Sequence, residues 1–407
     1  MRFPKQAKLL PAILLVLMPF MQGCGNFWQA PSGGSGSGGG TSTTLSSGVF
    51  YVANQTAKDI VAYQINSGSL TTINSYPLNS APYAIAITPG NSFLYVATIT
   101  GIYFYTIGSG GGLTAGNQGS AISNDFAQAI AVDPSGNWLV DAVAVGTGAS
   151  AQVTLNAISI NSSNGGLNSN TEQTQTFNVA YAAVKQMAIS GDGNYVFLAL
   201  AEGGTLVDIF AKGDNNPLGG RANTIATTTT GASALSIAVD PGTTPRLFYV
   251  GESEAVTGPS GGLRAFEYSS LASNTATEIS GSPYASGGLA PAAILPDPTG
   301  AYVYVASGQG AGSNGILNGF NISTSTANSQ TTYSLSSIST IATGIQPTGL
   351  AEDANSNFVF ATAQGGSDDL DIYIFDSTTL GKLDASNLST STGSDPTGAI
   401  AVAALTQ

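Results

Sequence analysis

A short unit recurs along most of this chain, and its spacing constrains the fold more than any other feature. The unit reads "PYAIAITPGNSFLYVAT" at 82–98, and it returns as "AQAIAVDPSGNWLVDAV" at 127–143 and "PAAILPDPTGAYVYVAS" at 291–307. Further copies begin near residues 184, 234 and 347, and a truncated copy ends the chain. The copies align at Thr88, Asp133, Ser190, Asp240, Asp297, Asp353 and Val402. This spacing suits the four-stranded blade of a β-propeller, whose repeats run ~40–50 residues.

Each copy divides into four short strands. A first strand of small and branched residues meets a turn such as Asp-Pro-Ser-Gly, in which Asp and Pro favour the bend and Gly accepts a positive φ. An aromatic strand such as "YVYVA" follows, then a third strand, and a Ser/Thr-rich fourth strand closes the unit. Without a helical period anywhere after the N-terminal segment, the pattern predicts an all-β protein.

The first strand of each copy carries unusually small side chains at its interior positions. Where several sheets converge on one axis, the innermost strands approach closely, so only small side chains fit between them. The aromatic second strands lie farther out and fill wider wedges. The positions are Ala84, Ala86, Ala129, Ala131, Ala188, Ser236, Ala238, Gly349 and Ala351.

The two ends of the chain complement each other. The segment "VFYVANQTAKDIVAYQI" at 49–65 matches a second and a third strand, whereas "PTGAIAVAALTQ" at 396–407 supplies only a first strand. Joining them predicts a seven-bladed propeller in which the N- and C-terminal strands share one blade. Six or eight blades would require an insertion, such as the one around 255–268, to hide strands.

Composition and charge exclude several classes of function. The chain has a net charge of −13 and no His, and only 8% of its residues are charged. A nucleic-acid partner is therefore disfavoured, because no basic stripe can displace counterions from phosphates. The single Cys excludes an internal disulfide and a thiolate zinc site. No cofactor is expected.

The N-terminal segment predicts export and a lipid anchor. A basic start and an apolar run make residues 1–23 a signal peptide, and Gly23 before Cys24 resembles the lipobox of bacterial lipoproteins. A flexible Gly/Ser-rich linker covers 24–47, and the propeller covers 48–407. We expect a monomer in the cell envelope, held in the periplasm or at the outer-membrane surface by lipid on Cys24. The alternative is an ordinary secreted protein with a leftover Cys.

Motifs in the aromatic strands carry a family resemblance. They read Tyr-Val-Ala-Asn at 51–54, Tyr-Val-Ala-Thr at 95–98 and Tyr-Val-Ala-Ser at 304–307, beside the Asp-Pro-x-Gly turns. Over residues 48–407 the chain resembles the YVTN-type propellers and the broader 6-phosphogluconolactonase-like family. The resemblance implies a propeller and, in the enzymatic members, a cleft where His, Arg and Glu act on a lactone. Because this chain lacks His, no catalytic residue is carried over.

Residues that enter each first strand are the candidate ligand contacts, because they should surround one mouth of the central channel. They could hydrogen-bond a neutral ligand such as a sugar, or they are solvated rim residues. The polar members are Tyr83, Gln128, Lys185, Thr348 and Thr397, and the apolar members are Leu235 and Ala292.

Acidic residues offer few other sites. We interpret Asp133, Asp240 and Asp297 as turn residues. Asp368, Asp369 and Asp371 lie in a Gly-rich loop that could supply oxygen ligands to Ca²⁺, although the spacing of a recognised calcium loop is missing. A charged strand edge is the other interpretation. The neighbourhood of Glu252, Glu254, Arg264 and Glu267 is interpreted as a surface ion pair.

The leading functional hypothesis is a binding module that presents loops on a rigid ring to a glycan or an envelope protein. One alternative is a lactone hydrolase, which rests on the family resemblance. The other is a structural or adhesive repeat protein of the cell surface. The sequence does not assemble a catalytic set that would favour the enzyme.

Overall fold

The computed structural model describes residues 48–66, 68–146, 150–179, 183–211, 217–242, 246–256, 260–268, 276–310, 312–327, 329–366, 368–390 and 398–405. Within these ranges the regular structure consists of strands β1 to β28 and one short 3-10 helix, η1 (Asn117–Gly119). All paired strands are antiparallel. The all-β prediction is confirmed. No helix in the described ranges is long and apolar enough to cross a membrane. Cys24 and Thr397 lie outside the described residues.

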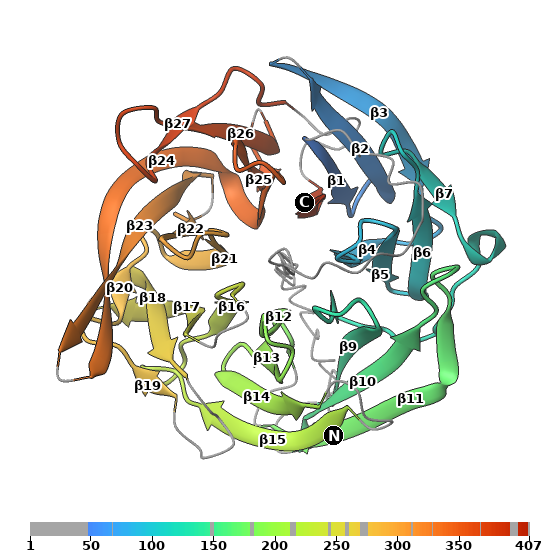
Figure 1. Ribbon diagram of the computed structural model, residues 1–407, viewed down its shortest axis with the longest axis horizontal. Helices are drawn as coiled ribbons and strands as arrows, with labels where there is room; N and C mark the ends of the chain where they lie inside the picture. Colours follow the sequence, from blue (N-terminus) through green and yellow to red (C-terminus); the bar gives the residue numbers. More distant parts are fainter. Residues whose placement is uncertain are drawn as a thin grey trace, which may run out of the picture.

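The described strands form six hydrogen-bonded sheets around one axis (Figure 1). Four of these sheets have four strands, which are given from the innermost outward. They are β28 (Ala399–Ala404), β1 (Val49–Asn54), β2 (Asp59–Asn66) and β3 (Ser69–Pro77); β4 (Pro82–Ile87), β5 (Phe93–Thr98), β6 (Gly101–Ile107) and β7 (Leu113–Ala115); β8 (Ala129–Val132), β9 (Trp138–Val145), β10 (Gln152–Ile160) and β11 (Leu167–Asn178); and β12 (Gln186–Ile189), β13 (Tyr195–Ala199), β14 (Thr205–Phe210) and β15 (Leu218–Ile225).

The remaining two sheets are larger. One contains β16 (Ala234–Val239), β17 (Leu247–Val256), β18 (Ser260–Glu267) and β19 (Thr277–Glu278), with β20 (Tyr284–Ala285) also paired to β18. The other contains β21 (Ala290–Pro296), β22 (Tyr302–Gly308), β23 (Asn314–Ala327), β24 (Gln330–Glu352), β25 (Phe358–Gly365), β26 (Leu370–Phe375) and β27 (Leu383–Ala385).

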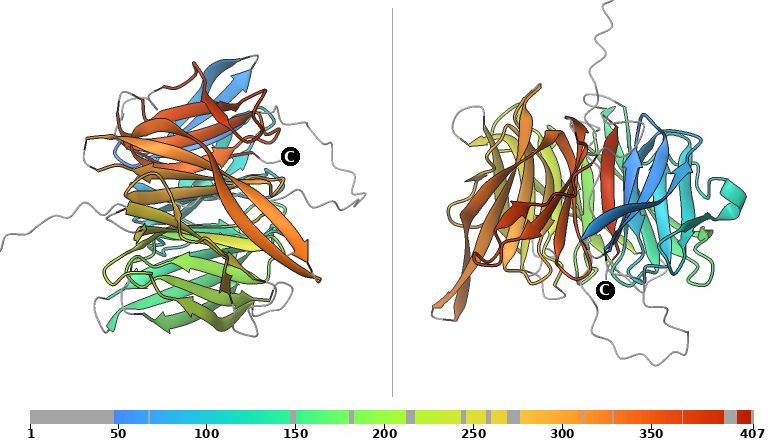
Figure 2. Two further views of the ribbon diagram at one scale, coloured as in Figure 1. Left: turned by 90° about the vertical axis from the view of Figure 1, so that its left-hand side faces the viewer. Right: turned by 90° about the horizontal axis from the view of Figure 1, so that it is seen from above.

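Strand β24 explains why the described chain has six sheets instead of the seven separate blades predicted. Its first part pairs with β23, from Gln330 to Ile345, and its last part pairs with β25, from Ile345 to Glu352. The chain therefore runs from the outside of one four-stranded unit to the inside of the next without a break in the strand. The β23–β24 hairpin also extends beyond the body of the ring (Figure 2).

The first and last strands of the described chain belong to one sheet. β28 pairs with β1, so that Val402 lies opposite Val52. The backbone N–H of Leu405 donates to the carbonyl of Val49 at 3.1 Å. The innermost strands also contact one another in the order β28, β4, β8, β12, β16, β21, β24 and back to β28.

The close approach of these strands accounts for the small side chains predicted there. Ala86, Ala131 and Ser236 are completely buried, and Gly349 is buried beside them in the same layer. A side chain as large as Leu at these positions would overlap the neighbouring strand, because interiors are packed without spare volume.

Tyrosines of the aromatic strands connect neighbouring sheets. The hydroxyl groups of Tyr51 and Tyr95 each donate to a glycine carbonyl in the next sheet, at Gly111 and Gly165, both at 2.8 Å. Tyr304 makes a similar bond to Gly381 at 2.9 Å, in the β26–β27 turn of its own seven-stranded sheet. Each acceptor glycine has a positive φ, between 74° and 80°. The turn that needs glycine is therefore also the turn that receives the tyrosine.

Replacing Tyr95 with Phe should lower the free energy of unfolding by about 1–3 kcal/mol, because the buried Gly165 carbonyl would lose its donor. Urea unfolding of Tyr95→Phe and wild type measures this difference. Tyr333→Phe is the matched control, since Tyr333 is half-buried and its hydroxyl makes no hydrogen bond with the described residues. Equal losses in the two variants would contradict the assigned role of Tyr95.

Candidate functional site

The predicted ligand contacts that the structure describes lie where the innermost strands begin or, in β24, where its inner part begins, and we call this side of the ring the mouth face. At four of these positions the strand contains a β-bulge, so that Tyr83, Leu235, Ala292 and Thr348 each have no residue opposite them in the neighbouring strand. A bulge turns a side chain out of the regular alternation. The repeat thus places one redirected residue at the start of β4, β16 and β21 and of the inner part of β24.

Two of the predicted contacts are engaged within the fold. The Gln128 side-chain carbonyl accepts the N–H of Ala144 at 2.7 Å, and Gln128 is buried. The buried Thr348 hydroxyl hydrogen-bonds to the carbonyl of Ala399 at 2.9 Å, which joins β24 to β28. These side chains stabilise the ring, so they have little capacity left for a ligand.

Tyr83 and Lys185 remain partly accessible on the mouth face. The ring of Tyr83 packs edge-on against Phe126, with centroids 5.4 Å apart. Lys185 precedes β12 on a neighbouring part of the ring, and burial lowers the pKa of its amino group. The structure therefore provides an aromatic pair and one cation near the starts of β4, β8 and β12.

Four exposed apolar side chains lie on the same face, and the sequence analysis missed them. Phe126 is 41% exposed and Leu289 is 42% exposed, and both precede innermost strands. Ile99 and Val145, each 50% exposed, lie where second strands end. In the sequence, only their position next to strand ends could have indicated that these side chains are exposed. Their residue types are the same as those of the core. An apolar ring face of this kind is a candidate for ligand binding.

The opposite face carries the Asp turns. The Asp133 carboxylate accepts the backbone N–H groups of Asn137 and Trp138 at 2.8 and 2.7 Å. Asp353 does the same with the residues four and five positions after it. Asp240 differs, since it accepts from the Tyr249 hydroxyl and pairs with Arg246 at 3.2 Å. The prediction that Asp133 acts through turn chemistry is confirmed.

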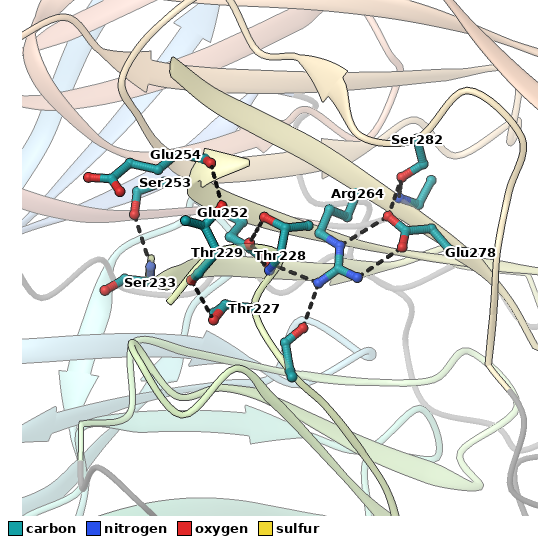
Figure 3. Close-up of polar contacts among 12 residues, drawn as sticks. Thr227, Thr228, Thr229, Ser233, Glu252, Ser253, Glu254, Arg264, Glu278 and Ser282 are labelled. Atoms are coloured by element: carbon teal, nitrogen blue, oxygen red, sulfur yellow. Dashed lines mark hydrogen bonds and ion pairs between the residues drawn. The ribbon is translucent and has the colours of Figure 1, made fainter. Parts of the chain in front are cut away.

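The Arg264 cluster is a buried network and not the surface ion pair that we predicted (Figure 3). Arg264 donates to both oxygens of Glu278 at 3.0 and 2.9 Å and to Glu252 at 3.0 Å. It also donates to the carbonyl of Ala226 at 2.8 Å. Burial opposes the charge, but hydrogen bonds and charges from the two glutamates outweigh it and raise the pKa of Arg264. The network joins the segment before β16 to β17, β18 and β19.

This arrangement leaves Arg264 poorly suited to stabilise an oxyanion. Four of its hydrogen bonds go to protein oxygens, and its guanidinium also stacks on Phe266, 4.8 Å from the ring centroid. An incoming anion would have to displace a carboxylate. The geometry therefore assigns Arg264 to the fold.

The calcium candidates do not form a metal site in the part of the chain that the structure describes, where no group of three acidic side chains is placed to hold a metal ion. Asp371 instead accepts the backbone N–H of Gly344 at 2.6 Å, and Asp369 is completely buried. Burial raises the pKa of Asp371.

The structural comparisons identify the fold. No family model and no curated protein matches the sequence. A solved protein from Bacteroides uniformis, provisionally named a 6-phosphogluconolactonase, is 16% identical with a TM-score of 0.64, over 88% of this chain and 98% of that one. The periplasmic gluconolactonase of Pseudomonas aeruginosa is 17% identical with a TM-score of 0.60, over 86% and 97%. At these identities the likeness shows a lactonase-like β-propeller of four-stranded blades.

Buried carboxyl groups without cations are a further feature that the sequence analysis missed. Glu352 is 2% exposed, and neither carboxyl oxygen has a partner at normal hydrogen-bond geometry. Burial is the main cause that raises its pKa to about 8, the Ser356 side chain offsets part of this effect, and Asp297 and Asp353 add to it. Other copies of the unit carry apolar residues such as Ile87 at this position. This difference between the copies could have indicated from the sequence that Glu352 is buried.

Glu352 should make the protein less stable as the pH rises from about 4.5 to about 8. In this window the unfolded chain loses the proton of Glu352 while the folded protein retains it, so unfolding becomes more favourable. Glu352→Gln should remove this loss and be more stable than wild type at pH 8, on the order of a few kcal/mol.

Urea unfolding of both proteins between pH 4.5 and 8 tests this effect, with the exposed Glu202→Gln as control. A stability difference between Glu352→Gln and wild type that stays constant across this range would rule out the assigned protonation state.

Proposed function

We propose that this protein binds an uncharged, polyhydroxylated ligand, a sugar or a sugar lactone, on its mouth face. The main support for this proposal is the partly exposed Phe126 ring, which packs against Tyr83. Other exposed apolar side chains lie on the same face. Aromatic rings with a polar handle suit ligands that have both C–H faces and hydroxyl groups. A rigid ring holds such contacts in place, which reduces the entropy cost of binding.

The charges of the described residues favour an uncharged ligand over a phosphorylated one. Arg246 and Arg264 are paired with carboxylates. Lys382 contacts Asp376 and Asp384 at 2.6 Å, and Arg221 donates to the carbonyl of Asn178. The chain also has a net charge of −13, which repels anions. These cations therefore do not supply a preorganised phosphate clamp.

Hydrolysis of an unphosphorylated sugar lactone is the second candidate, and it is favoured by the likeness to the Pseudomonas gluconolactonase. Such a reaction needs a group that activates water and a group that stabilises the oxyanion. Lys185 is a described cation on the mouth face, and burial lowers the pKa of its amino group, which suits proton transfer. The absence of His means that a carboxylate or Lys185 would have to act as the base.

Binding and hydrolysis are distinguished with glucono-1,5-lactone and its 6-phosphorylated form. We expect calorimetric binding of glucose or the unphosphorylated lactone, weakened about tenfold or more in Phe126→Ala, and little binding of the phosphorylated form. Leu380→Ala is the matched control, since Leu380 is 80% exposed and lies in the turn before β27, away from the mouth face.

Lactone opening, followed by pH change, tests the enzyme hypothesis. A rate above the spontaneous one that falls in Lys185→Ala would favour hydrolysis. Failure of any sugar or lactone to bind at the mouth face, or equal effects of Phe126→Ala and Leu380→Ala, would contradict the proposed function.

We also infer that the ring has seven four-stranded blades, with β24 contributing an outer strand to one blade and the innermost strand to the next. The two separate pairings of β24 and the ring of contacts among seven innermost strands support this count. The pairing of β28 with β1 supports closure of the ring by the two termini.

We further propose that the propeller is held in the cell envelope by lipid on Cys24, with residues 24–47 as a spacer. This proposal rests on the sequence pattern alone. An extracytoplasmic position would suit a surface that carries few charged residues and many hydroxyl groups.

A further inference from the structure

A tyrosine-lined slot lies on the outer part of the ring, between the end of β3 and the strands β6 and β7, which lie beside each other in Figure 1. Its volume is about 260 Å³. This is slightly below the ~300–1,000 Å³ typical of small-molecule sites, so it suits a single ring and not a long ligand. The slot is lined by Tyr76, Pro77, Leu78, Asn79, Tyr103, Tyr105, Ala115 and Gly119.

Side chains along β6 point alternately to its two faces, and both of its tyrosines point into this slot. Tyr103 and Tyr105 line the slot, whereas Phe104 and Thr106 line a separate cavity of about 430 Å³ on the other side of the strand. Successive side chains of a strand point to opposite faces. The Tyr-x-Tyr spacing within "IYFYTI" therefore brings two phenol rings to one surface.

Two of the three tyrosines are held in place by hydrogen bonds. The Tyr76 hydroxyl accepts the backbone N–H of Leu113 at 2.8 Å. The Tyr103 hydroxyl lies 3.1 Å from that of Thr100. The rings of Tyr76 and Tyr105 are 6.4 Å apart and inclined by 58°. These contacts fix the walls of the slot before any ligand arrives.

Tyr105 provides the observation that points to a ligand. It is only 7% exposed, and its hydroxyl makes no hydrogen bond with any described residue. The hydroxyl oxygen is not one of the fully buried polar atoms without a partner, so it reaches the open space of the slot. A molecule in the slot can therefore hydrogen-bond to it without displacing a protein group.

A strained turn borders the slot beside Ala115. Asn117, Gln118 and Gly119 have φ values of 46°, 54° and 77°, so three consecutive residues are left-handed. For the two non-glycine residues this conformation costs energy, and such strain concentrates at ligand-binding segments. The turn places the small residues Ala115 and Gly119 in the slot wall, which leaves room for a ring.

We propose that this slot is a second binding site, separate from the Tyr83–Phe126 pair, for one uncharged sugar ring such as the terminal residue of a glycan. Its lining contains no charged side chain, so neither a carboxylate nor an ammonium ligand would find an ion pair. The tyrosine rings would pack against the C–H face of the sugar. The Tyr105 hydroxyl and the exposed Asn79 amide would hydrogen-bond its hydroxyl groups.

The test uses the full chain and the methyl glycosides of glucose, galactose, mannose and N-acetylglucosamine, with binding followed by saturation-transfer NMR. We expect at least one glycoside to bind. Tyr105→Phe should weaken its binding about fivefold or more, and Tyr103→Ala about tenfold or more. Tyr333→Phe is the matched control and should bind like wild type.

The variants also separate a binding effect from a folding effect. Tyr105→Phe should melt at the wild-type temperature, because the lost hydroxyl makes no hydrogen bond in the described chain. Loss of all glycoside binding in Phe126→Ala would place the ligand on the mouth face and overturn the slot. Binding of no glycoside by wild type, or equal binding by Tyr105→Phe, would overturn it as well.

Discussion

The innermost strands meet around one axis, and the space between them is too narrow for large side chains. This constraint explains why the first strand of each repeat is built from residues such as Ala86, Ala131 and Ser236. It also makes each strand depend on its two neighbours, because a strand in the ring buries both faces against adjacent strands. A missing strand would expose two such faces, so the pairing of β28 with β1 matters to the whole molecule.

The tyrosine of the aromatic strand connects this inner layer to the periphery. Tyr51 and Tyr95 each reach a glycine carbonyl in the next sheet, and Tyr304 reaches one in the β26–β27 turn of its own seven-stranded sheet; each acceptor turn needs glycine for its positive φ. One recurring residue therefore packs a wedge and fixes the angle between neighbouring sheets. This double role gives a physical reason for the Tyr-Val-Ala motifs, which specify a fold and carry no information about chemistry.

The sequence predicted those features that repeat, and it missed those that depend on a single tertiary contact. The four-stranded unit, the small inner residues and the pairing of the chain ends all follow from alignment of the copies. The continuous course of β24 could not be predicted, because it depends on the register of two pairings within one segment. The burial of Arg264 and the position of the Tyr105 hydroxyl in a slot could not be predicted either. Both depend on how neighbouring parts of the ring pack against these side chains.

The two faces of the ring differ in a way that bears on function. The mouth face exposes apolar side chains such as Phe126 and Leu289, whereas the opposite face carries Asp residues whose carboxylates are occupied by backbone N–H groups. The lactonase-like fold provides a scaffold, and this chain combines it with a mouth face that lacks His. A binding role for neutral sugars is consistent with this combination.

Closure of the ring by its two ends is the central claim, and thermal unfolding of a chain that lacks residues 396–407 tests it most directly. Without β28, the strand β1 loses its inner partner and the ring opens. The account predicts a clearly lower melting temperature than that of the intact chain, which a synthetic peptide of residues 396–407 should restore in part. A truncated protein that melts like the intact one would contradict it.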